Sequence, residues 1–260
     1  MSIKLYSWNV LHIIHELNYA SDCCYVLDNW LNNESERLRE IAKIIVKHSS
    51  YSKAIFCIQE CPGDLLNLLH ELNTHNDFTI NTYRYPRHPK IKNHNATNPY
   101  IDSTEQLVIL LGKDIMLREL KSIQFEDPGK ASLIAKINIF DKNISIANIH
   151  CPFGPSRSVA FKQLLEEIID DTYIIIGDMN SDENEIKKMF NDKKYVFSNI
   201  SKPTRIAKSI RKTKKGNVIE IRETIIDHVI GSIDLTYKNI FVGNQDNLSD
   251  HLIIGTDVHF

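Results

Sequence analysis

The sequence predicts an α+β domain in which layered β-sheet packs against a few helices. Extended apolar segments outnumber segments with helical periodicity, and several of them follow one another with no helix between them. This order favours an α+β layered domain over a doubly wound fold, in which strands and helices alternate. Many of the extended segments also end in a polar cluster, which is how a sheet-based enzyme assembles an active site from distant parts of the sequence.

The predicted strands are short, extended apolar runs that recur along the whole chain. They contain the residues that we expect to form the sheet core. In chain order they are Ile3–Val10, Ala54–Ile58, Gln106–Leu111, Ser132–Ile139, Ile144–Ile149, Tyr173–Ile176, Ile225–Ile230 and Leu252–Val258.

Helical periodicity, with apolar residues three or four positions apart, is found in three segments. These are Ser35–Lys47, Leu65–Leu72 and Val159–Ile169. Ser35 is a suitable N-cap for the first helix, and Pro62 lies where the second helix is expected to begin. The sequence therefore predicts fewer helices than strands.

Composition sets limits on the class of protein. The chain has 260 residues, which fits one large α/β domain or two small ones, and an apolar fraction of 42% is enough for a sizeable core. The formal net charge of -2 does not indicate a polyanion partner. No apolar stretch approaches the roughly 18 residues of a membrane span, and the N-terminal segment lacks the apolar run of a secretory signal.

The cysteines indicate the redox setting. There are five, an odd number, and Cys23 and Cys24 are adjacent. This favours reduced thiols in an intracellular protein, cytoplasmic or nuclear, over a disulfide framework. Cys57 and Cys61 have no matching Cys/His pair at a finger-like spacing, so we do not expect a zinc site.

Two segments carry a local excess of positive charge, Arg84–His94 and Lys202–Arg222. Both can be read as solvated loops. Alternatively, their charge draws a polyanion to one face of the protein despite the near-neutral total. The basic residues of the second segment are Lys202, Arg205, Lys208, Arg211, Lys212, Lys214, Lys215 and Arg222.

The polar cluster after the strand Tyr173–Ile176 carries the most chemical information. Asp178 and Asn180 are two positions apart, and alternate residues of an extended chain share a side, so both can point into one site. A carboxylate beside an amide donor is suited to holding a water molecule and a phosphate group together. The alternative is a strand that ends in an ordinary Asp/Asn turn.

Further polar clusters follow other predicted strands in a defined order. They are Trp8-Asn9, Gln59-Glu60, Asn148-Ile149-His150, Asp227-His228 and Ser249-Asp250-His251. Together with Asp178 and Asn180, this order and spacing resembles the endonuclease/exonuclease/phosphatase superfamily, from Leu5 to Val258. The resemblance implies one domain over residues 1–260. It also implies a four-layer α/β sandwich in which two mainly antiparallel or mixed β-sheets pack face to face with helices outside.

The resemblance also implies a metal site. Glu60 matches the metal ligand of the superfamily, Asn9 lies beside it, and Asp250 matches an acid that often serves as a second ligand or contacts water. A hard divalent cation such as Mg²⁺ takes oxygen ligands and keeps several waters, so these side chains and a substrate phosphate would suffice. The expected cofactor is therefore Mg²⁺, with Mn²⁺ as an alternative.

The remaining expected roles are catalytic. Asp178 matches the residue that orients or deprotonates the attacking water, and Asn180 matches the donor that holds the phosphate. His251 matches the histidine at the scissile phosphate, with Asp227 as its partner, because a neighbouring carboxylate favours the imidazolium. A cation and a charged histidine can offset the charge that grows on the phosphoryl oxygens.

Three further residues complete the expected site. His150 matches the histidine near the leaving group. Asn148 supports the same strand end, and we expect it to bind substrate. Arg205 belongs to a Pro-Thr-Arg stretch that several branches of the superfamily share, and we expect it to bind substrate. The segment Thr104–Leu107 departs from the superfamily pattern, which usually has a glycine there.

Other polar and aromatic residues are expected to be structural. His12 and His15 have no acid at a fitting distance and are interpreted as surface or packing residues, and His228 should face away from Asp227. Three tyrosines either stack on nucleic-acid bases or pack beneath a loop, namely Tyr83, Tyr85 and Tyr100.

The function that we expect is Mg²⁺-dependent hydrolysis of a phosphodiester in nucleic acid, RNA or DNA, by a monomeric enzyme. The two basic segments are the reason to prefer a polymer substrate. The alternative is a phosphatase or phospholipase of the same fold that acts on phosphoinositide or sphingomyelin. A catalytically silent binding module is disfavoured because Glu60, Asp178 and His251 are all present.

Overall fold

The computed structural model describes residues 1–19, 30, 33–93, 96–168, 172–190, 195–213, 216–244 and 247–260. Within these ranges the chain forms two large mixed β-sheets, one small sheet and five helices. Five residues singled out above lie outside the described residues: Cys23, Cys24, His94, Lys214 and Lys215.

The first large sheet has six strands in the order β13-β14-β1-β2-β4-β3. Its only parallel pair is β1 with β2, and its other neighbours are antiparallel. The strands are β1 (Ser2–Asn9), β2 (Ala54–Pro62), β3 (Phe78–Arg84), β4 (Glu105–Gly112), β13 (Thr236–Val242) and β14 (Ile254–His259).

The second large sheet repeats this pattern of pairing. Its order is β5-β6-β7-β8-β12-β9, and its only parallel pair is β7 with β8. The strands are β5 (Met116–Gln124), β6 (Ala131–Ile139), β7 (Lys142–His150), β8 (Thr172–Asp178), β9 (Tyr195–Phe197) and β12 (Asp227–Ser232). Each of the eight strands predicted from the sequence overlaps one of these twelve.

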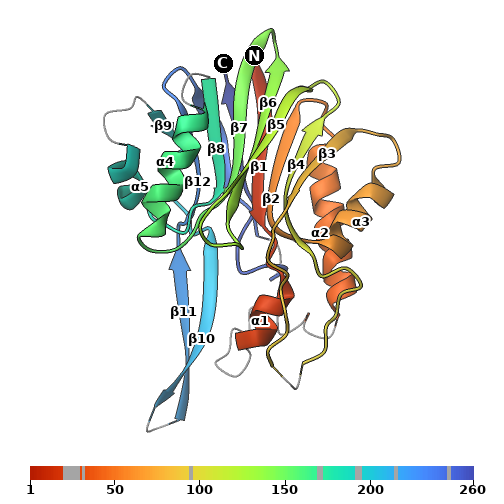
Figure 1. The fold of residues 1–260 in the computed structure, drawn as a ribbon, viewed down its shortest axis with the longest axis vertical. Helices are drawn as coiled ribbons and strands as arrows, with labels where there is room; N and C mark the ends of the chain where they lie inside the picture. Colours follow the sequence, from red (N-terminus) through yellow and green to blue (C-terminus); the bar gives the residue numbers. More distant parts are fainter. Residues whose placement is uncertain are drawn as a thin grey trace.

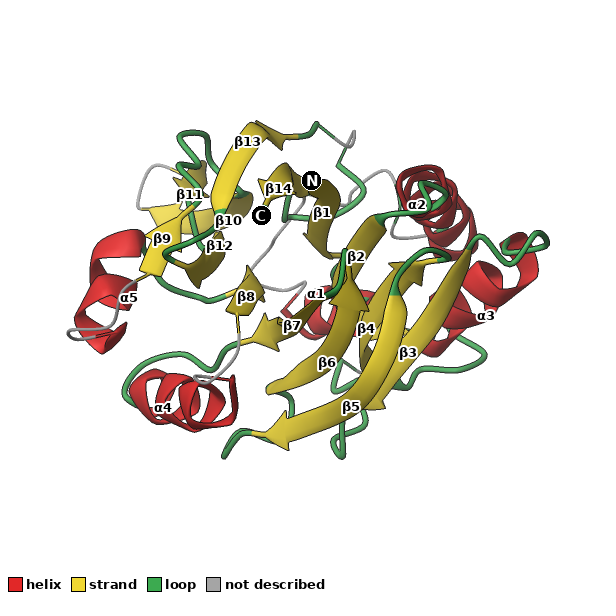
Figure 2. Ribbon diagram, turned by 90° about the horizontal axis from the view of Figure 1, so that it is seen from above, coloured by secondary structure: helices red, strands yellow, loops and turns green. Residues whose placement is uncertain are grey.

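The two sheets pack face to face with helices on their outer sides (Figure 2). A central apolar core between them includes Leu5, Ile109 and Ile176. A second core lies under α2 (Glu34–Ser49) and α3 (Gly63–Leu72), and a third lies under α4 (Ser156–Ile168) and α5 (Glu183–Phe190). The predicted four-layer α/β sandwich is therefore confirmed.

The helices begin close to their predicted positions, with one correction. α2 starts at Glu34, and Ser35 lies inside it as an exposed residue, so Ser35 is not the N-cap. The reason is that the Glu34 side chain turns inward to the guanidinium of Arg37, which draws the residue before Ser35 into the first turn. The sequence did not predict two short helices, α1 (Ile13–Tyr19), which follows β1, and α5, which follows β8. No helix within the described residues is long and apolar enough to cross a membrane.

The basic segment Lys202–Arg222 is not a loop. Most of it forms an antiparallel hairpin of β10 (Arg205–Thr213) and β11 (Gly216–Thr224), which pair with each other in a separate two-stranded sheet. Its β-branched residues suit extended backbone, as in the opposed pair Ile210 and Ile219. The hairpin projects from the end of the sandwich at which β1 leads into α1 (Figure 1).

Candidate active site

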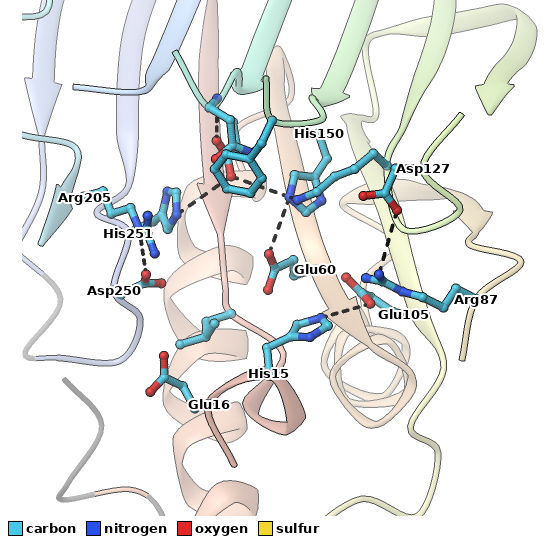
Figure 3. A pocket seen from close by; sticks show the side chains of 15 residues that line it. His15, Glu16, Glu60, Arg87, Glu105, Asp127, His150, Arg205, Asp250 and His251 are labelled. Carbon is cyan, nitrogen blue, oxygen red and sulfur yellow. Dashed lines mark hydrogen bonds and ion pairs between the residues drawn. The ribbon is translucent and has the colours of Figure 1, made fainter. Parts of the chain in front are cut away.

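A cavity of about 310 Å³ opens at the end of the sandwich from which the hairpin projects (Figure 3). It collects side chains from both large sheets, from α1 and from the hairpin. Of the expected site residues, seven line it directly, whereas Asn9, Asn148 and Asp227 do not. The lining residues are Leu11, His15, Glu16, Glu60, Arg87, Glu105, Asp127, Lys130, His150, Phe153, Asp178, Asn180, Arg205, Asp250 and His251.

The register of the second sheet brings three of the expected residues side by side. His150 ends β7 opposite Asp178 at the end of the parallel strand β8. Asp227 begins the antiparallel strand β12 opposite the same Asp178. Since parallel strands present their carboxyl ends at one edge of a sheet, β7 and β8 bring His150 and Asp178 to the cavity, and Asp227 lies beside Asp178 behind its lining.

Gly177 is required where β8 approaches the cavity. Its φ is 139°, and a Cβ atom there would lie 2.2 Å from the carbonyl oxygen of Ile149 on β7. Any larger residue would push the two strands apart and displace the adjacent Asp178. Three residues further on, Asn180 has a φ of 49°, which turns the chain after the strand.

Glu60 reaches the cavity through an irregularity in β2. The register of β2 against β4 shifts between Ile58 and Cys61, and Glu60 has a φ of 55°. Its Oε2 atom accepts the backbone N–H of His12 at 3.1 Å. Burial alone would raise the pKa of Glu60, but the positive charges of His15 and Lys130 hold the pKa well below its usual range.

Asn9 lies behind the two acids and joins them. Its Nδ2 atom donates to Glu60 Oε1 at 3.2 Å and to Asp178 Oδ2 at 3.1 Å. Its Oδ1 atom accepts the backbone N–H of Leu11 at 3.0 Å. In the structure, Asn9 is therefore a donor that holds two carboxylates. Its Oδ1 atom, which we expected to bind the metal, accepts a backbone N–H instead.

His251 and Asp227 form a buried pair. Nδ1 of His251 lies 2.9 Å from Oδ2 and 3.1 Å from Oδ1 of Asp227, while Nε2 lies 3.8 Å from Asp178 Oδ2. Burial opposes the charge on the imidazole, but Asp227, Asp250 and Asp178 raise the pKa of His251 to about 10. For Asp178, burial and the nearby Asp227 raise the pKa of the carboxyl group above its ordinary value.

His150 is a neutral histidine held between two neighbours. Its Nδ1 atom lies 3.1 Å from the hydroxyl of Tyr85, and its Nε2 atom is in hydrogen-bonding contact with Nζ of Lys130. Burial and the charge of Lys130 lower the pKa of His150 well below its ordinary value. Because the ammonium donates to Nε2, the ring carries its proton on Nδ1 and donates it to Tyr85.

Lys130 and Tyr85 were not predicted as site residues. Lys130 precedes β6, is buried, and lies 5.5 Å from the ring centroid of Phe153. Tyr85 follows β3 and packs in the central core, so packing rather than stacking on a base is its role. Tyr100 is likewise buried and donates to Glu34 at 2.7 Å. For Tyr85, the only signal in the sequence was the positive charge of the segment Arg84–His94, in which it lies.

Asn148, which we expected to bind substrate, does not line the cavity. It is 0% exposed, and its Nδ2 atom donates to the carbonyl oxygens of Ile58 and Val108. Its Oδ1 atom accepts from Gln59 at 2.6 Å. All of these partners belong to the first large sheet, so Asn148 ties the two sheets together beneath the cavity and corrects the assignment to substrate binding.

Arg205 and Asp250 connect the hairpin to the cavity. Nε of Arg205 donates to Asp250 Oδ2 at 2.8 Å, which raises the pKa of the guanidinium. The backbone N–H of Ile206 donates to the Asp250 carbonyl oxygen at 2.8 Å, and Arg205 forms an isolated bridge with His251. Within the described residues, Oδ1 of Asp250 has no hydrogen-bond partner.

The structure also corrects the interpretation of His15. Its Nε2 atom lies 3.3 Å from Oε2 of Glu105, so it does have an acid partner. Glu105 begins β4 and lines the same cavity as Glu60. His12 is a packing residue as expected, with Nε2 3.2 Å from the carbonyl oxygen of Ser103 and a pKa lowered to about 3 by burial and His15.

A divalent cation suits this part of the cavity. Ligand atoms of His15, Glu60 and Glu105 all lie within 4.8 Å of one another. Oε1 of Glu105 is buried and, in the part of the chain that the structure describes, has no hydrogen-bond partner. By contrast, His228 directs Nε2 to the carbonyl oxygen of Ser181 at 2.8 Å and does not line the cavity, in agreement with a structural role.

Comparison with known proteins rests on structure alone. No protein-family model and no curated protein sequence matches the chain. TDP2 of D. rerio, solved with a single-strand DNA product, has a TM-score of 0.71 and 14% identity over 100% of this chain and 99% of that one. An endonuclease/exonuclease/phosphatase protein of Bacteroides vulgatus has a TM-score of 0.69 and 13% identity over 100% and 99%.

A third similar structure is the human Nocturnin catalytic domain with a bound sulfate anion. It has a TM-score of 0.66 and 15% identity, and the alignment covers 100% of this chain and 93% of that one. These likenesses extend over the whole length of the chain. They confirm the fold that the order of polar clusters predicted.

Proposed function

From the endonuclease/exonuclease/phosphatase fold of this chain, we propose that the protein is a metal-dependent phosphodiesterase that hydrolyses nucleic acid. One observation carries the proposal. Oδ2 of the buried Asp178 lies 3.8 Å from Nε2 of His251, and His251 is paired with Asp227 through its Nδ1 atom. Asp178 and His251 line a cavity that also contains the carboxylate of Glu60. This arrangement combines a proton acceptor, a fixed positive charge and an oxygen ligand for a cation.

Asp178 would accept a proton from the attacking water. The backbone N–H of Asn180 donates to its Oδ1 atom at 2.9 Å and Asn9 donates to its Oδ2 atom, so the carboxylate is held in one orientation. Burial raises the pKa of Asp178, which makes the carboxylate a better base than an exposed aspartate. Positioned proton transfer of this kind contributes about 10² to 10⁴ in rate.

His251 would stabilise the negative charge that develops on the phosphoryl oxygens. Asp227 occupies Nδ1, which leaves the Nε2–H free to donate into the cavity. A donor that is already oriented and charged costs no reorganisation during the reaction, which is why such groups contribute strongly to catalysis. Lys130 lines the same cavity and adds a second positive charge.

Glu60 and Asp250 would contribute oxygen ligands for a divalent ion, Mg²⁺ or Mn²⁺, since Oδ1 of Asp250 has no hydrogen-bond partner in the described part of the chain. When bound, such an ion acts as a Lewis acid that polarises the phosphoryl oxygen. Asn9 fixes the orientation of Glu60 from behind, as outer hydrogen bonds commonly do for metal ligands.

A second cavity of about 430 Å³ supports a polymer substrate. It shares Phe153, Asn180 and Arg205 with the first cavity, and its other charged lining residues are Arg157, Asp182, Glu185 and Arg222. Arg157 is paired with Glu185 at 2.6 Å, so Arg222 is the arginine of this second cavity that we expect to meet a further phosphate of a polymer. The solved complex of the similar D. rerio TDP2 contains single-strand DNA, which is consistent with this choice.

The test is a panel of substrates incubated with Mg²⁺ or Mn²⁺. It comprises single-stranded RNA, single- and double-stranded DNA, abasic DNA, 2′-5′ oligomers, phosphoinositides and sphingomyelin. We expect cleavage of at least one polynucleotide by the wild-type protein and none by Asp178→Asn purified in the same way. Hydrolysis of the lipids alone would contradict the proposal and support the phosphatase or phospholipase alternative.

A further inference from the structure

A group of three ionisable side chains lies together on one side of the cavity, apart from His251 and Asp250 (Figure 3). His15 comes from α1, Glu60 from the irregular part of β2 and Glu105 from the first position of β4. Their ligand atoms are all within 4.8 Å of one another. Since three separate elements supply them, no short sequence motif reveals the group.

The environment of the Glu105 carboxylate indicates that the group binds a cation. The residue is 1% exposed and lines the cavity, and its Oε2 atom lies 3.3 Å from Nε2 of His15. Its Oε1 atom is buried and has no hydrogen-bond partner among the described residues. A carboxylate oxygen removed from water with nothing to bind is costly, and a cation in contact with it would remove that cost.

The surrounding backbone fixes the two acids next to each other. Glu105 is opposite Pro62 in the antiparallel pair of β4 and β2, two residues beyond Glu60. The backbone N–H of His12 and the amide of Asn9 hold the Glu60 carboxylate. Hydrogen bonds of this kind orient metal ligands in proteins.

We propose that His15, Glu60 and Glu105 hold one divalent transition-metal ion and that this site binds Mn²⁺ more tightly than Mg²⁺. The proposal rests on the proposed function, because Glu60 is the carboxylate assigned there to the metal. Mg²⁺ prefers oxygen ligands and retained waters, whereas an imidazole nitrogen suits transition metals. His15 is therefore the residue that sets the preference for the ion, and at this site Glu105, rather than Asp250, supplies the second carboxylate.

The test measures metal binding without substrate. Free Mn²⁺ is followed by electron paramagnetic resonance during titration of the full-length protein, and Mg²⁺ affinity is obtained by competition. We expect one tight Mn²⁺ site in the wild type. Glu105→Gln should weaken Mn²⁺ binding by at least about tenfold, the lower end of the loss seen when even outer contacts of a metal site are removed. His15→Gln should weaken Mn²⁺ binding more than Mg²⁺ binding.

Asp127→Asn is the matched control. Asp127 lines the same cavity but lies beside Arg87 at 3.8 Å, outside the proposed ligand set, and asparagine can still accept the Gly129 N–H. We expect this variant to keep the wild-type affinity for Mn²⁺. An equal loss in Asp127→Asn, or an unchanged affinity in both His15→Gln and Glu105→Gln, would overturn the proposed site.

Thermal unfolding separates loss of a ligand from loss of the fold. Mn²⁺ should raise the melting temperature of the wild type, since a ligand that binds the native state stabilises it. Mn²⁺ should raise the melting temperatures of His15→Gln and Glu105→Gln by less. If either variant does not fold, His15→Asn or Glu105→Asp replaces it. Mn²⁺ binding without any hydrolysis would refute the proposed function alone. Hydrolysis with an unchanged Mn²⁺ affinity in both His15→Gln and Glu105→Gln would refute this site alone.

Discussion

Nδ1 of His251, which precedes β14 of the first sheet, lies 2.9 Å from Oδ2 of Asp227 at the start of β12 in the second sheet, and both side chains are buried. This pairing, with the neighbouring Asp250 and Asp178, raises the pKa of His251 from 6.5 to about 10 against the effect of burial. The imidazole is therefore charged throughout the physiological range of pH. The activity should therefore depend on the positive charge of the His251 imidazolium.

Asp227→Asn should move the alkaline limit of activity to lower pH. In the wild type, hydrolysis that needs the His251 imidazolium should persist until the pH approaches the pKa of about 10. The amide removes the main charge that raises this pKa, so the variant should lose activity at a lower pH. The measurement is kcat/KM as a function of pH, and an alkaline limit that stays in place would contradict the assignment.

The same pair should affect stability in a defined pH window. Because the folded-state pKa of His251 is raised, its contribution is fully present below the ordinary value of 6.5 and is lost as the pH rises through about 10. The difference in unfolding free energy between wild type and Asp227→Asn should therefore be larger at pH 6 than above pH 10. Urea denaturation at several pH values measures it.

Asp178→Asn should reduce hydrolysis by about 10² to 10⁴ without loss of the fold, since the amide keeps the shape of the carboxylate but cannot accept the proton. Asp234→Asn, in an exposed turn between β12 and β13, is the control. Single-turnover rates with saturating substrate report the chemical step. Activity of Asp178→Asn equal to that of the control would show that Asp178 is not the proton acceptor.

Arg222→Ala should weaken binding of polynucleotides and flatten its dependence on salt. Arg222 lines the second cavity, and each phosphate that the protein no longer neutralises should reduce the slope of log K against log salt by about 0.7 for a single strand. Lys113→Ala, exposed in the turn between β4 and β5, should leave the slope unchanged. Fluorescence anisotropy at several salt concentrations measures both variants, and identical slopes would exclude the second cavity as a phosphate path.

Chelation should abolish hydrolysis. EDTA removes the cation for which Glu60 is the expected ligand, and Mg²⁺ or Mn²⁺ added in excess should restore the rate. Recovery is measured on the same sample, so loss of protein is not mistaken for loss of metal. Full activity in EDTA would contradict a role for a metal ion in the reaction.

Arg37→Met should destabilise the fold strongly. Arg37 is 0% exposed and donates to Glu34 and to the carbonyl oxygens of Val10, Leu11 and Leu248. Removing one partner of a buried ion pair costs about 3–5 kcal/mol because the other charge stays buried. The exposed Arg39→Met should cost less than about 0.5 kcal/mol. Urea denaturation compares them, and similar midpoints would refute this account.

The central strands were predictable because their sequences are apolar on both faces. β4 and β8 are buried on both sides, and such runs stand out without knowledge of the fold. β5 was missed because most of its residues are exposed and five of its nine are polar or charged, so that pairing with β6 decides its structure. The hairpin of β10 and β11 was taken for a loop because its positive charge conceals the β-branched residues.

The candidate site divides in the same way. Residues at strand ends, such as Asp178 and His251, could be predicted because sheets collect their strand ends at one edge. Lys130, His15 and Glu105 were not predicted, although Glu105 begins β4 and Lys130 directly precedes β6, because only the packing of separate elements places them beside the site. Asn148 was misassigned because sequence order does not show that its amide spans the gap between the two sheets.

The pairing of β1 with β14 joins two segments that are far apart in the sequence. Ser2 is opposite His259 in that ladder, so β1 can pair with β14 only after residues 254–259 have been synthesised. Pairings of such high sequence separation slow folding and leave a strand edge open to other chains in the meantime. Asn9 lies at the end of β1 and His251 precedes β14, so a nascent chain brings these two residues of the candidate site together only after both strands have been made.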